Sequence, residues 1–213
     1  MLVIFDLDGT LIDSSQDLAI SMNATRAHFG LPPIEPAVIY SYVGNGAAVL
    51  VERAMGADLP PAAIGDALRF FLDFYRAHAL EHTKLYSGVR ELVQELSARG
   101  HRLAVLTNKP VAISIDIVRA LALGDYFMRV YGGNSFAAKK PDPSGVFALM
   151  QEADAPANAT WLVGDSSVDV KTARNAGVRS CGVAWGFQPE TFELEPPDVL
   201  IRQPQELLGW VSR

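Results

Sequence analysis

Cysteine is almost absent from this sequence, and no long hydrophobic run opens it. Cys181 is the single cysteine among 213 residues, which argues against a disulfide framework and against a cysteine zinc site. The first apolar stretch, residues 2–5, is followed at once by aspartate and is far too short for a signal peptide or a membrane helix. We therefore expect a cytoplasmic protein with no membrane partner.

Positive charge is scarce as well. Lysine and arginine number 18 against 24 acidic residues, so the formal net charge is -6. This balance gives no basic surface for nucleic acid or for an anionic membrane. The counter-charge for an anionic substrate must then come from local lysines and a bound metal ion. A hydrophobic fraction of 49% fits an ordinary globular protein of one or two domains.

Short, continuous apolar runs recur along the chain and indicate strands that are covered on both faces, as in a parallel sheet. These runs lie at residues 2–5, 102–107, 127–133, 160–165, 180–185 and 198–201. Helical patterns alternate with them at residues 88–100, 110–124 and 167–177. Each pattern ends at a glycine, Gly100, Gly124 or Gly177, which we expect to form a left-handed helix cap. The alternation predicts an α/β fold with a Rossmann-like parallel-sheet core.

One long segment breaks the alternation. Residues 15–83 show helical periodicity, punctuated by prolines and without a convincing strand. This is much longer than an ordinary connection between a strand and a helix. We therefore predict a small helical cap domain at 15–83, inserted into a catalytic core made of residues 1–14 and 84–213.

Polar side chains cluster where the predicted strands end. In parallel α/β sheets the ligand lies beyond the carboxyl ends of the strands, so these residues are expected to meet at one edge. They are Asp6, Asp8, Gly9 and Thr10 after the first strand, Thr107, Asn108 and Lys109 after the second, Lys139 and Lys140 beyond the third, and Gly164, Asp165, Ser166 and Asp169 after the fourth. Four strand ends would then deliver carboxylates, a hydroxyl and lysines to one edge of the sheet.

Four short motifs, "FDLDGT", "LTNKP", "KKPDP" and "GDSSVD", resemble the ordered motifs of the haloacid dehalogenase-like (HAD) phosphohydrolases. The resemblance implies that Asp6 attacks phosphorus and becomes an aspartyl phosphate, while Asp8 acts as general acid and base. It also implies that Thr107 and the backbone N–H groups near Asn108 hold phosphoryl oxygens, and that Lys140 neutralises their charge. Halide-displacing members lack the second aspartate, so Asp8 favours a phosphatase.

The same resemblance implies a Mg²⁺ ion, with Mn²⁺ and Co²⁺ as alternatives, and that ion would make the acidic cluster tolerable. Its ligands would be the Asp6 and Asp165 carboxylates and the backbone carbonyl of Asp8. Asp169 is expected to orient the waters of the metal or Lys140, or else to be an ordinary acid in the first turn of a helix. Gly9 is expected to allow a tight turn beneath the phosphate.

The predicted cap carries a finer resemblance. Residues 42–55, "YVGNGAAVLVERAM", and "GVAWGF" are similar to bacterial phosphoglycolate phosphatases, which implies 2-phosphoglycolate as substrate. The N–H groups of the Gly44-Asn45-Gly46 loop could then face the anion, although the loop could also be a simple turn between helices. Asn134 stands where that subgroup often has an acidic residue, and Arg53 is the arginine nearest the loop.

Several alternatives stay open at this point. A HAD phosphatase for a sugar phosphate, such as N-acetylmuramate 6-phosphate, and a β-phosphoglucomutase-like phosphotransferase would share the motifs of the core. A non-enzymatic receiver module also uses strand-end aspartates, Mg²⁺, a threonine and a lysine, but it would need neither a cap nor Asp8. The expected partner is in each enzymatic case a small phosphate ester, and the sequence does not decide between a monomer and a homodimer.

Overall fold

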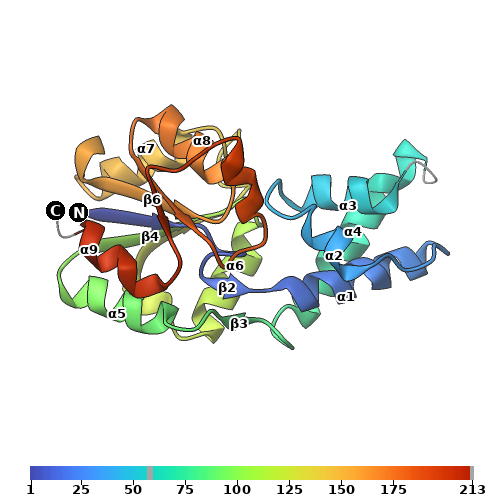
Figure 1. The fold of residues 1–213 in the computed structure, drawn as a ribbon. Coiled ribbons are helices and arrows are strands. Elements are labelled where there is room, and N and C mark those ends of the chain that lie inside the picture. Colours follow the sequence, from blue (N-terminus) through green and yellow to red (C-terminus); the bar gives the residue numbers. More distant parts are fainter. Residues whose placement is uncertain (57–59, 212–213) are drawn as a thin grey trace.

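The continuous apolar runs form the strands of one parallel sheet, as predicted (Figure 1). The computed structural model describes residues 1–56 and 60–211. In it, the six-stranded sheet has the order β5-β4-β1-β6-β7-β8. Its strands are β1 (Leu2–Phe5), β4 (Arg102–Leu106), β5 (Phe127–Tyr131), β6 (Thr160–Gly164), β7 (Arg179–Val183) and β8 (Val199–Ile201).

The register of the central strands brings their carboxyl ends to the same level. Phe5, the last residue of β1, pairs with Val105 on one side and with Val163 on the other. The ladder continues one step further, because the N–H of Asp6 donates to the carbonyl of Val163 at 2.8 Å. The residues that follow β1, β4 and β6 therefore leave the sheet from one edge.

Alternate residues of the strands pack on opposite faces of the sheet. Leu2 and Ile4 of β1 belong to one apolar cluster, which α7 and α8 cover, and Val3 and Phe5 belong to the other. Figure 1 shows α7 and α8 above the sheet and α5, α6 and α9 below it. These helices are α5 (Val89–Ala98), α6 (Val111–Ala120), α7 (Ser144–Glu152), α8 (Ser167–Ala176) and α9 (Leu208–Val211). Burial on both faces explains why the strands have continuous apolar sequences.

Short helical turns complete the connections in this part of the chain. The 3-10 turns are Gly124–Tyr126, Ala157–Ala159, Pro189–Glu193 and Pro204–Leu207. Helix α7 was missing from the sequence-based prediction. Its start has a local signal, because the Asp142 carboxylate accepts hydrogen bonds from the N–H and the hydroxyl of Ser144.

The predicted glycine caps are right at two positions and wrong at the third. Gly100 and Gly177 have φ values of 77° and 68°, which only glycine adopts without strain. Gly124 does not have this conformation. Helix α6 ends earlier, at Ala120, and Ala122 takes the positive φ of 53° while its N–H donates to Arg119. Leu123 is then buried, and Gly124 begins a 3-10 turn.

The helices of the segment 15–83 lie together beside the sheet, to the right in Figure 1. They are α1 (Ser15–His28), α2 (Pro36–Tyr40), α3 (Ala47–Met55) and α4 (Pro61–His78). Buried apolar side chains such as Met22, Val51 and Phe71 pack between them. The buried guanidinium of Arg26 donates to the carbonyls of Pro32 and Ala54, which ties α1 to the end of α3.

Two very short strands lie where the chain enters and leaves this helical segment. β2 (Ile12–Asp13) and β3 (Lys84–Leu85) pair antiparallel, and the sequence-based prediction contained neither of them.

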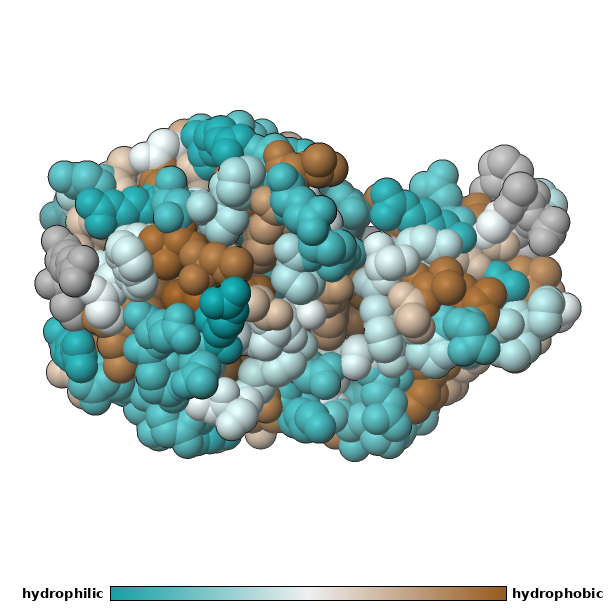
Figure 2. All heavy atoms as spheres, in the orientation of Figure 1, coloured by the Kyte–Doolittle hydropathy of each residue, from teal (hydrophilic) through white to brown (hydrophobic). Residues whose placement is uncertain are grey.

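Hydrophilic side chains cover most of the face shown in Figure 2, with apolar groups gathered in smaller areas. None of the helices in the described part of the chain is both long and apolar enough to cross a membrane.

Asp17, in the first turn of α1, links the start of the helical segment to His82 and Thr83, where the chain leaves that segment. Its side chain is 1% exposed. Its carboxylate accepts hydrogen bonds from the N–H of His82 at 3.0 Å and from the N–H and hydroxyl of Thr83 at 2.8 and 2.7 Å. Burial alone would raise the pKa of Asp17, but the hydrogen bonds from Thr83 and His82 outweigh it and hold the pKa below its ordinary value.

We expect Asp17→Asn to lower the free energy of unfolding by about 2–4 kcal/mol near neutral pH, because the new NH₂ group faces donors that the carboxylate accepted. Since the folded pKa is depressed, the contribution of Asp17 is present above its unfolded value of 3.8 and is lost as the pH falls further. Urea denaturation at neutral and acidic pH measures this difference.

The matched control is Asp66→Asn, because Asp66 forms an exposed ion pair with Arg69 one turn along α4. This change should cost less than about 1 kcal/mol. An equal loss in the two variants, or a loss at Asp17 that does not shrink on acidification, would contradict the assignment.

Candidate active site

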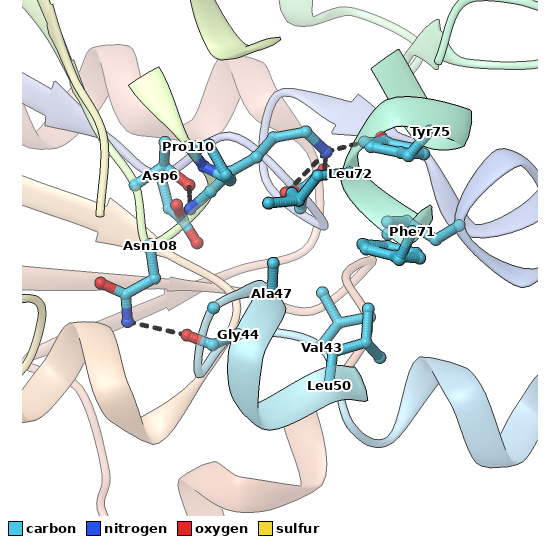
Figure 3. Close-up of a pocket in the computed structure, with 15 residues that line it drawn as sticks. Asp6, Val43, Gly44, Ala47, Leu50, Phe71, Leu72, Tyr75, Asn108 and Pro110 are labelled. Carbon is cyan, nitrogen blue, oxygen red and sulfur yellow. Dashed lines mark hydrogen bonds and ion pairs between the residues drawn. The ribbon is translucent and has the colours of Figure 1, made fainter. Parts of the chain in front are cut away.

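A cavity lies beyond the carboxyl ends of β1 and β4, between the sheet edge and the helices α1, α3 and α4 (Figure 3). The cavity has a volume of about 40 Å³, so it suits a small ligand. The sheet edge contributes Asp6, Asp8, Thr107, Asn108, Lys109 and Pro110, and the helical segment contributes Leu18, Val43, Gly44, Gly46, Ala47, Leu50, Phe71, Leu72 and Tyr75.

Most of the residues selected from the sequence meet at this place. Asp6, Asp8, Thr107, Asn108 and Gly44 line the cavity directly. Lys140, Asp165, Asp169 and Gly9 lie immediately behind Asp6, as the distances below show. Asn45 does not line the cavity. It lies on a neighbouring open hollow together with Arg53, Lys139 and Lys140.

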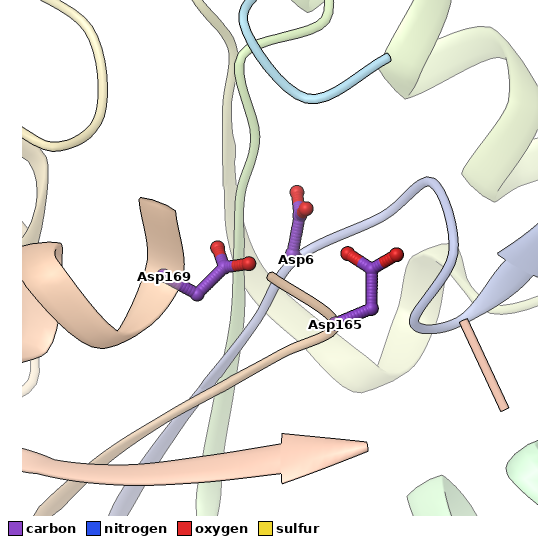
Figure 4. A group of neighbouring side chains, drawn as sticks. All are labelled: Asp6, Asp165 and Asp169. Carbon is purple, nitrogen blue, oxygen red and sulfur yellow. The ribbon is translucent and has the colours of Figure 1, made fainter. Parts of the chain in front are cut away.

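Three buried carboxylates come together at the edge. Asp6, Asp165 and Asp169 each offer an oxygen, and these atoms lie within 4.8 Å of one another (Figure 4). The ammonium of Lys140 is 2.9 Å from Oδ1 of Asp6 and 2.6 Å from Oδ1 of Asp169. The other oxygen of Asp169 accepts hydrogen bonds from the N–H and hydroxyl of Ser166, which fixes the carboxylate at the start of α8.

The charges in this cluster are unbalanced. Burial raises the pKa of Asp6 to about 6, although Lys140 opposes the shift. Burial, followed by repulsion from Asp169 and Asp6, raises the pKa of Asp165 well above its ordinary value. Burial would lower the pKa of Lys140, but Asp169 and Asp6 raise it. Three carboxylates therefore share one ammonium group, and a further cation would favour their charged forms.

The oxygen atoms of the cluster fit a hard divalent cation. Oδ1 of Asp6 is buried and has no hydrogen bond of good geometry to a described residue, only the ion pair with Lys140. Asp165 accepts a hydrogen bond from the N–H of Phe187 at 2.7 Å through Oδ2. A cation that takes oxygen ligands and keeps several waters needs only one or two such carboxylates.

Two glycines allow the backbone to approach Asp165. Gly9 has a φ of 76°, and a Cβ atom there would lie 2.1 Å from Oδ2 of Asp165. A Cβ atom at Gly186 would lie 2.2 Å from Cβ of Asp165 and 2.5 Å from the carbonyl oxygen of Gly9. The turn expected at Gly9 is present, whereas the role of Gly186 was not anticipated from the sequence.

Asp8 has a set of hydrogen bonds and ion-pair contacts separate from that of the three clustered carboxylates. Nζ of Lys109 is 2.8 Å from Oδ1 and 3.1 Å from Oδ2 of Asp8, and the hydroxyl of Ser14 donates to Oδ1 at 2.5 Å. Lys109 also donates to the hydroxyl of Tyr75 in α4 at 2.6 Å. Burial raises the pKa of Tyr75 to about 12, so its hydroxyl keeps its proton at neutral pH.

Thr107 and Asn108 connect the strand end to the surrounding loops. Thr107 is buried, and its Oγ1 accepts a hydrogen bond from the N–H of Lys109 at 3.3 Å. The side-chain amide of Asn108 donates to the carbonyl of Gly44 at 2.8 Å (Figure 3) and to the carbonyl of Lys140 at 3.0 Å. This amide group therefore links the loop of Gly44 to the loop of Lys140.

The glycine loop before α3 meets the sheet edge through its carbonyl groups. Gly44 and Gly46 have φ values of 101° and 86°. Besides the contact of Asn108 with Gly44, Lys139 donates to the carbonyl of Asn45 at 2.5 Å. A Cβ atom on Gly46 would lie 3.1 Å from the carbonyl oxygen of Asn108. The loop thus needs glycine for a close approach, and anion binding by its N–H groups stays a prediction.

Comparison with known proteins gives one consistent result. The family model described as haloacid dehalogenase-like hydrolase matches residues 3–183. A phosphoglycolate phosphatase from Pseudomonas syringae pv. syringae is 40% identical over 190 residues, which cover 87% of this chain and 70% of that protein. A phosphoglycolate phosphatase from Vibrio vulnificus strain CMCP6 is 37% identical over 219 residues, covering 99% and 95%.

The fold gives the same match. A crystal structure from Haemophilus somnus, described as a predicted phosphoglycolate phosphatase, superposes with a TM-score of 0.93 at 30% identity. The match covers 100% of this chain and 97% of that one, and thus includes the helices of residues 15–83.

Proposed function

The chain belongs to the haloacid dehalogenase-like hydrolase family, and on that premise we propose that it is a Mg²⁺-dependent phosphatase that hydrolyses 2-phosphoglycolate through an aspartyl phosphate on Asp6. The family and its relatives identify a phosphoric monoester hydrolase. The observation that carries the residue assignment is the meeting of Asp6, Asp8, Thr107, Lys140 and Asp165 at one sheet edge.

In the proposed first step, a carboxylate oxygen of Asp6 attacks phosphorus and the bond to the leaving oxygen breaks. Asp8, which lines the same cavity, gives a proton to that leaving oxygen. In the second step Asp8 takes a proton from a water molecule, which attacks the phosphoryl group and frees Asp6. The hydroxyl of Thr107 and the ammonium of Lys140 stabilise the negative charge on the phosphoryl oxygens.

Asp6 and Asp165 would hold the metal ion together with the backbone carbonyl of Asp8. Their fit is supported by the charge imbalance of the cluster and by the buried Oδ1 of Asp6, which makes only an ion pair with Lys140 among the described residues. When bound, Mg²⁺ would supply positive charge to the phosphoryl group and to the carboxylates. Asp169 holds Lys140 at 2.6 Å and so aims its ammonium group toward Asp6.

We propose that residues 15–83 act as a cap that excludes water from the reaction, over a core of residues 1–14 and 84–213. Support comes from the lining of the cavity, where Leu50, Phe71 and Leu72 make the helical side apolar. The loop of Gly44 and Gly46 leads into α3, whose first residue also lines the cavity. A helix N-terminus favours an anion, so it suits the carboxylate of 2-phosphoglycolate.

The experiment is a measurement of phosphate release from 2-phosphoglycolate, sugar phosphates, nucleotides and pyrophosphate, with and without Mg²⁺. The proposal predicts metal-dependent turnover with the highest kcat/KM for 2-phosphoglycolate. A higher kcat/KM for a sugar phosphate such as N-acetylmuramate 6-phosphate would reject the substrate while keeping the chemistry of Asp6. No turnover of any ester would reject the enzymatic proposal as a whole and favour the receiver-like alternative.

Gly186→Ala tests how closely Asp165 must be held. The new Cβ atom would overlap Asp165 and the backbone of Gly9, so we expect a loss of about 1–3 kcal/mol in the free energy of unfolding. Displacement of a metal ligand by about 1 Å is expected to lower kcat about 100-fold. The control is Gly65→Ala in α4, where the new Cβ would meet no described residue beyond its own turn of helix within 4 Å. It should stabilise the protein by about 0.5–1 kcal/mol. Equal behaviour of the two variants would contradict the close approach at Gly186.

A further inference from the structure

Lys109 has a position that the proposed reaction leaves unexplained. Its side chain is 4% exposed, although it carries a charge and belongs to a loop at the edge of the cavity. Burial would lower the pKa of Lys109, but Asp8 and Tyr75 raise it above its ordinary value, so the ammonium stays charged. A buried charge needs partners of good geometry, and here each partner can be named.

The partners of Lys109 come from both sides of the cavity. An ammonium group has three protons, and Nζ contacts Oδ1 of Asp8, Oδ2 of Asp8 and the hydroxyl of Tyr75. The same Nζ lies 4.5 Å from the centroid of the Tyr75 ring. In Figure 3 a dashed line marks the contact that ends at Tyr75 on α4. Tyr75 is 2% exposed and stacks on Phe71, so α4 holds its ring in place.

The two oxygens of Asp8 are held differently. Oδ1 accepts the hydroxyl of Ser14 at 2.5 Å and the shorter contact with Lys109 at 2.8 Å. Oδ2 has only the longer contact with Lys109, at 3.1 Å, among the described residues. Oδ1 is therefore the anchored atom, and Oδ2 is the atom that remains available to carry a proton to or from the reacting oxygen.

We propose that Lys109 and Tyr75 form a positioning pair that holds the carboxyl group of Asp8 in place for both proton transfers. The pair joins Asp8 to α4, so Asp8 is fully held only when α4 lies over the cavity. This inference rests on the proposed function, because it assumes that Asp8 is the general acid and base. It adds two residues whose polar contacts in the structure are with the carboxyl group of Asp8 and with each other.

Comparison of two substrates separates this role from a general structural one. The alkyl ester 2-phosphoglycolate needs a proton on its leaving oxygen, whereas p-nitrophenyl phosphate has a leaving group that departs without one. If 2-phosphoglycolate is not turned over, the best alkyl phosphate of the panel takes its place. The ratio kcat/KM covers only the steps through departure of the leaving group, and kcat with the aryl ester includes hydrolysis of the aspartyl phosphate.

The Lys109→Met variant is expected to lower two constants by about tenfold or more: kcat/KM for the alkyl ester and kcat for the aryl ester. It should change the third constant, kcat/KM for the aryl ester, by less than about threefold. Tyr75→Phe keeps the ring and removes only the hydroxyl, so it should give the same pattern at about threefold. Because Tyr75→Phe is a small change, it still tests the proposal if Lys109→Met does not fold. Thermal denaturation of each variant will show whether it folds.

Two further variants make the outcomes distinguishable. Asp8→Asn should give the same pattern, with losses of about 100-fold or more. If Asp8→Asn did not show this pattern, the role of Asp8 and with it the proposed function would be rejected. Lys139→Met also removes a lysine near the cavity but one that contacts Asn45 instead of Asp8, so it should not change the ratio of the two kcat/KM values. If Asp8→Asn shows the pattern while Lys109→Met and Tyr75→Phe lower all three constants equally, or none, the positioning pair is rejected.

Discussion

Asp6→Asn is expected to lower turnover by about 10⁴-fold or more while the protein stays folded. An amide oxygen is a poor nucleophile, and an asparagine of the same shape fits the same buried position. Burial raises the pKa of Asp6 from 3.8 to about 6. The ionised carboxylate therefore destabilises the folded protein at pH values above 3.8. Removing that charge relieves repulsion with Asp165 and Asp169, so the free energy of unfolding near neutral pH should not fall by more than about 1 kcal/mol.

The measurement is phosphate release together with urea denaturation, with mass spectrometry to exclude deamidation of the new asparagine back to aspartate. Asp73→Asn makes the same chemical change at an exposed position of α4 and should keep full activity. Substantial turnover by undeamidated Asp6→Asn would remove Asp6 as the nucleophile. Loss of folding would instead show that the carboxylate is required for structure.

Removal of divalent metal is the second change with a large expected effect. We expect a chelator to reduce turnover to background and added Mg²⁺ to restore it, because three buried carboxylates share a single ammonium group. Binding should also stabilise the folded protein, by about 2.7 kcal/mol when Mg²⁺ is at 100 times its Kd. This second readout does not depend on catalysis.

The Asp165→Asn variant tests where that metal binds. Loss of a carboxylate ligand should weaken Mg²⁺ binding about 100-fold or more, so the increase in Tm should shift to much higher Mg²⁺ concentrations. Asp73→Asn again serves as the matched control and should respond to Mg²⁺ as the unchanged protein does. Full activity in chelator, or an unaltered increase in Tm for Asp165→Asn, would contradict the proposed metal site.

The sheet could be predicted because its strands are buried on both faces and therefore have continuous apolar sequences. The elements that were missed are short or atypical. β2 and β3 have two residues each, too few to show a period. Gly124 looked like a helix cap, but Ala122 adopted the left-handed conformation because α6 ended earlier and Leu123 entered the core.

The site could be predicted only where it follows the sheet. Asp6, Thr107 and Asp165 each come directly after a strand, so topology alone brings them together. Tyr75 reaches Lys109 from the opposite side of the cavity, across a sequence separation of 34 residues, and nothing in its local pattern distinguishes it from a core aromatic. Asn45 was expected beside the other site residues; it does not line the cavity but lies on the neighbouring hollow, which it shares with Lys139 and Lys140.

The contacts of Lys109 and the importance of Gly186 were missed for different reasons. Lys109 stands inside the "LTNKP" motif, so its neighbours did provide a signal, but a lysine at a strand end gives no indication of which carboxylate it will contact. Gly186 follows an apolar strand as many glycines do. Its importance comes from the close approach to Asp165, which requires the three-dimensional arrangement.

The most direct test of the account is to identify the phosphorylated residue in Asp8→Asn. With p-nitrophenyl phosphate the leaving group needs no proton, so phosphoryl transfer to Asp6 should proceed while hydrolysis of the intermediate is slow. Acid quenching followed by peptide mass spectrometry should find about one phosphoryl group per chain, located on Asp6, together with a matching burst of p-nitrophenol. Release of p-nitrophenol with no phosphoryl group on the protein, or with one on another residue, would contradict the proposed covalent mechanism.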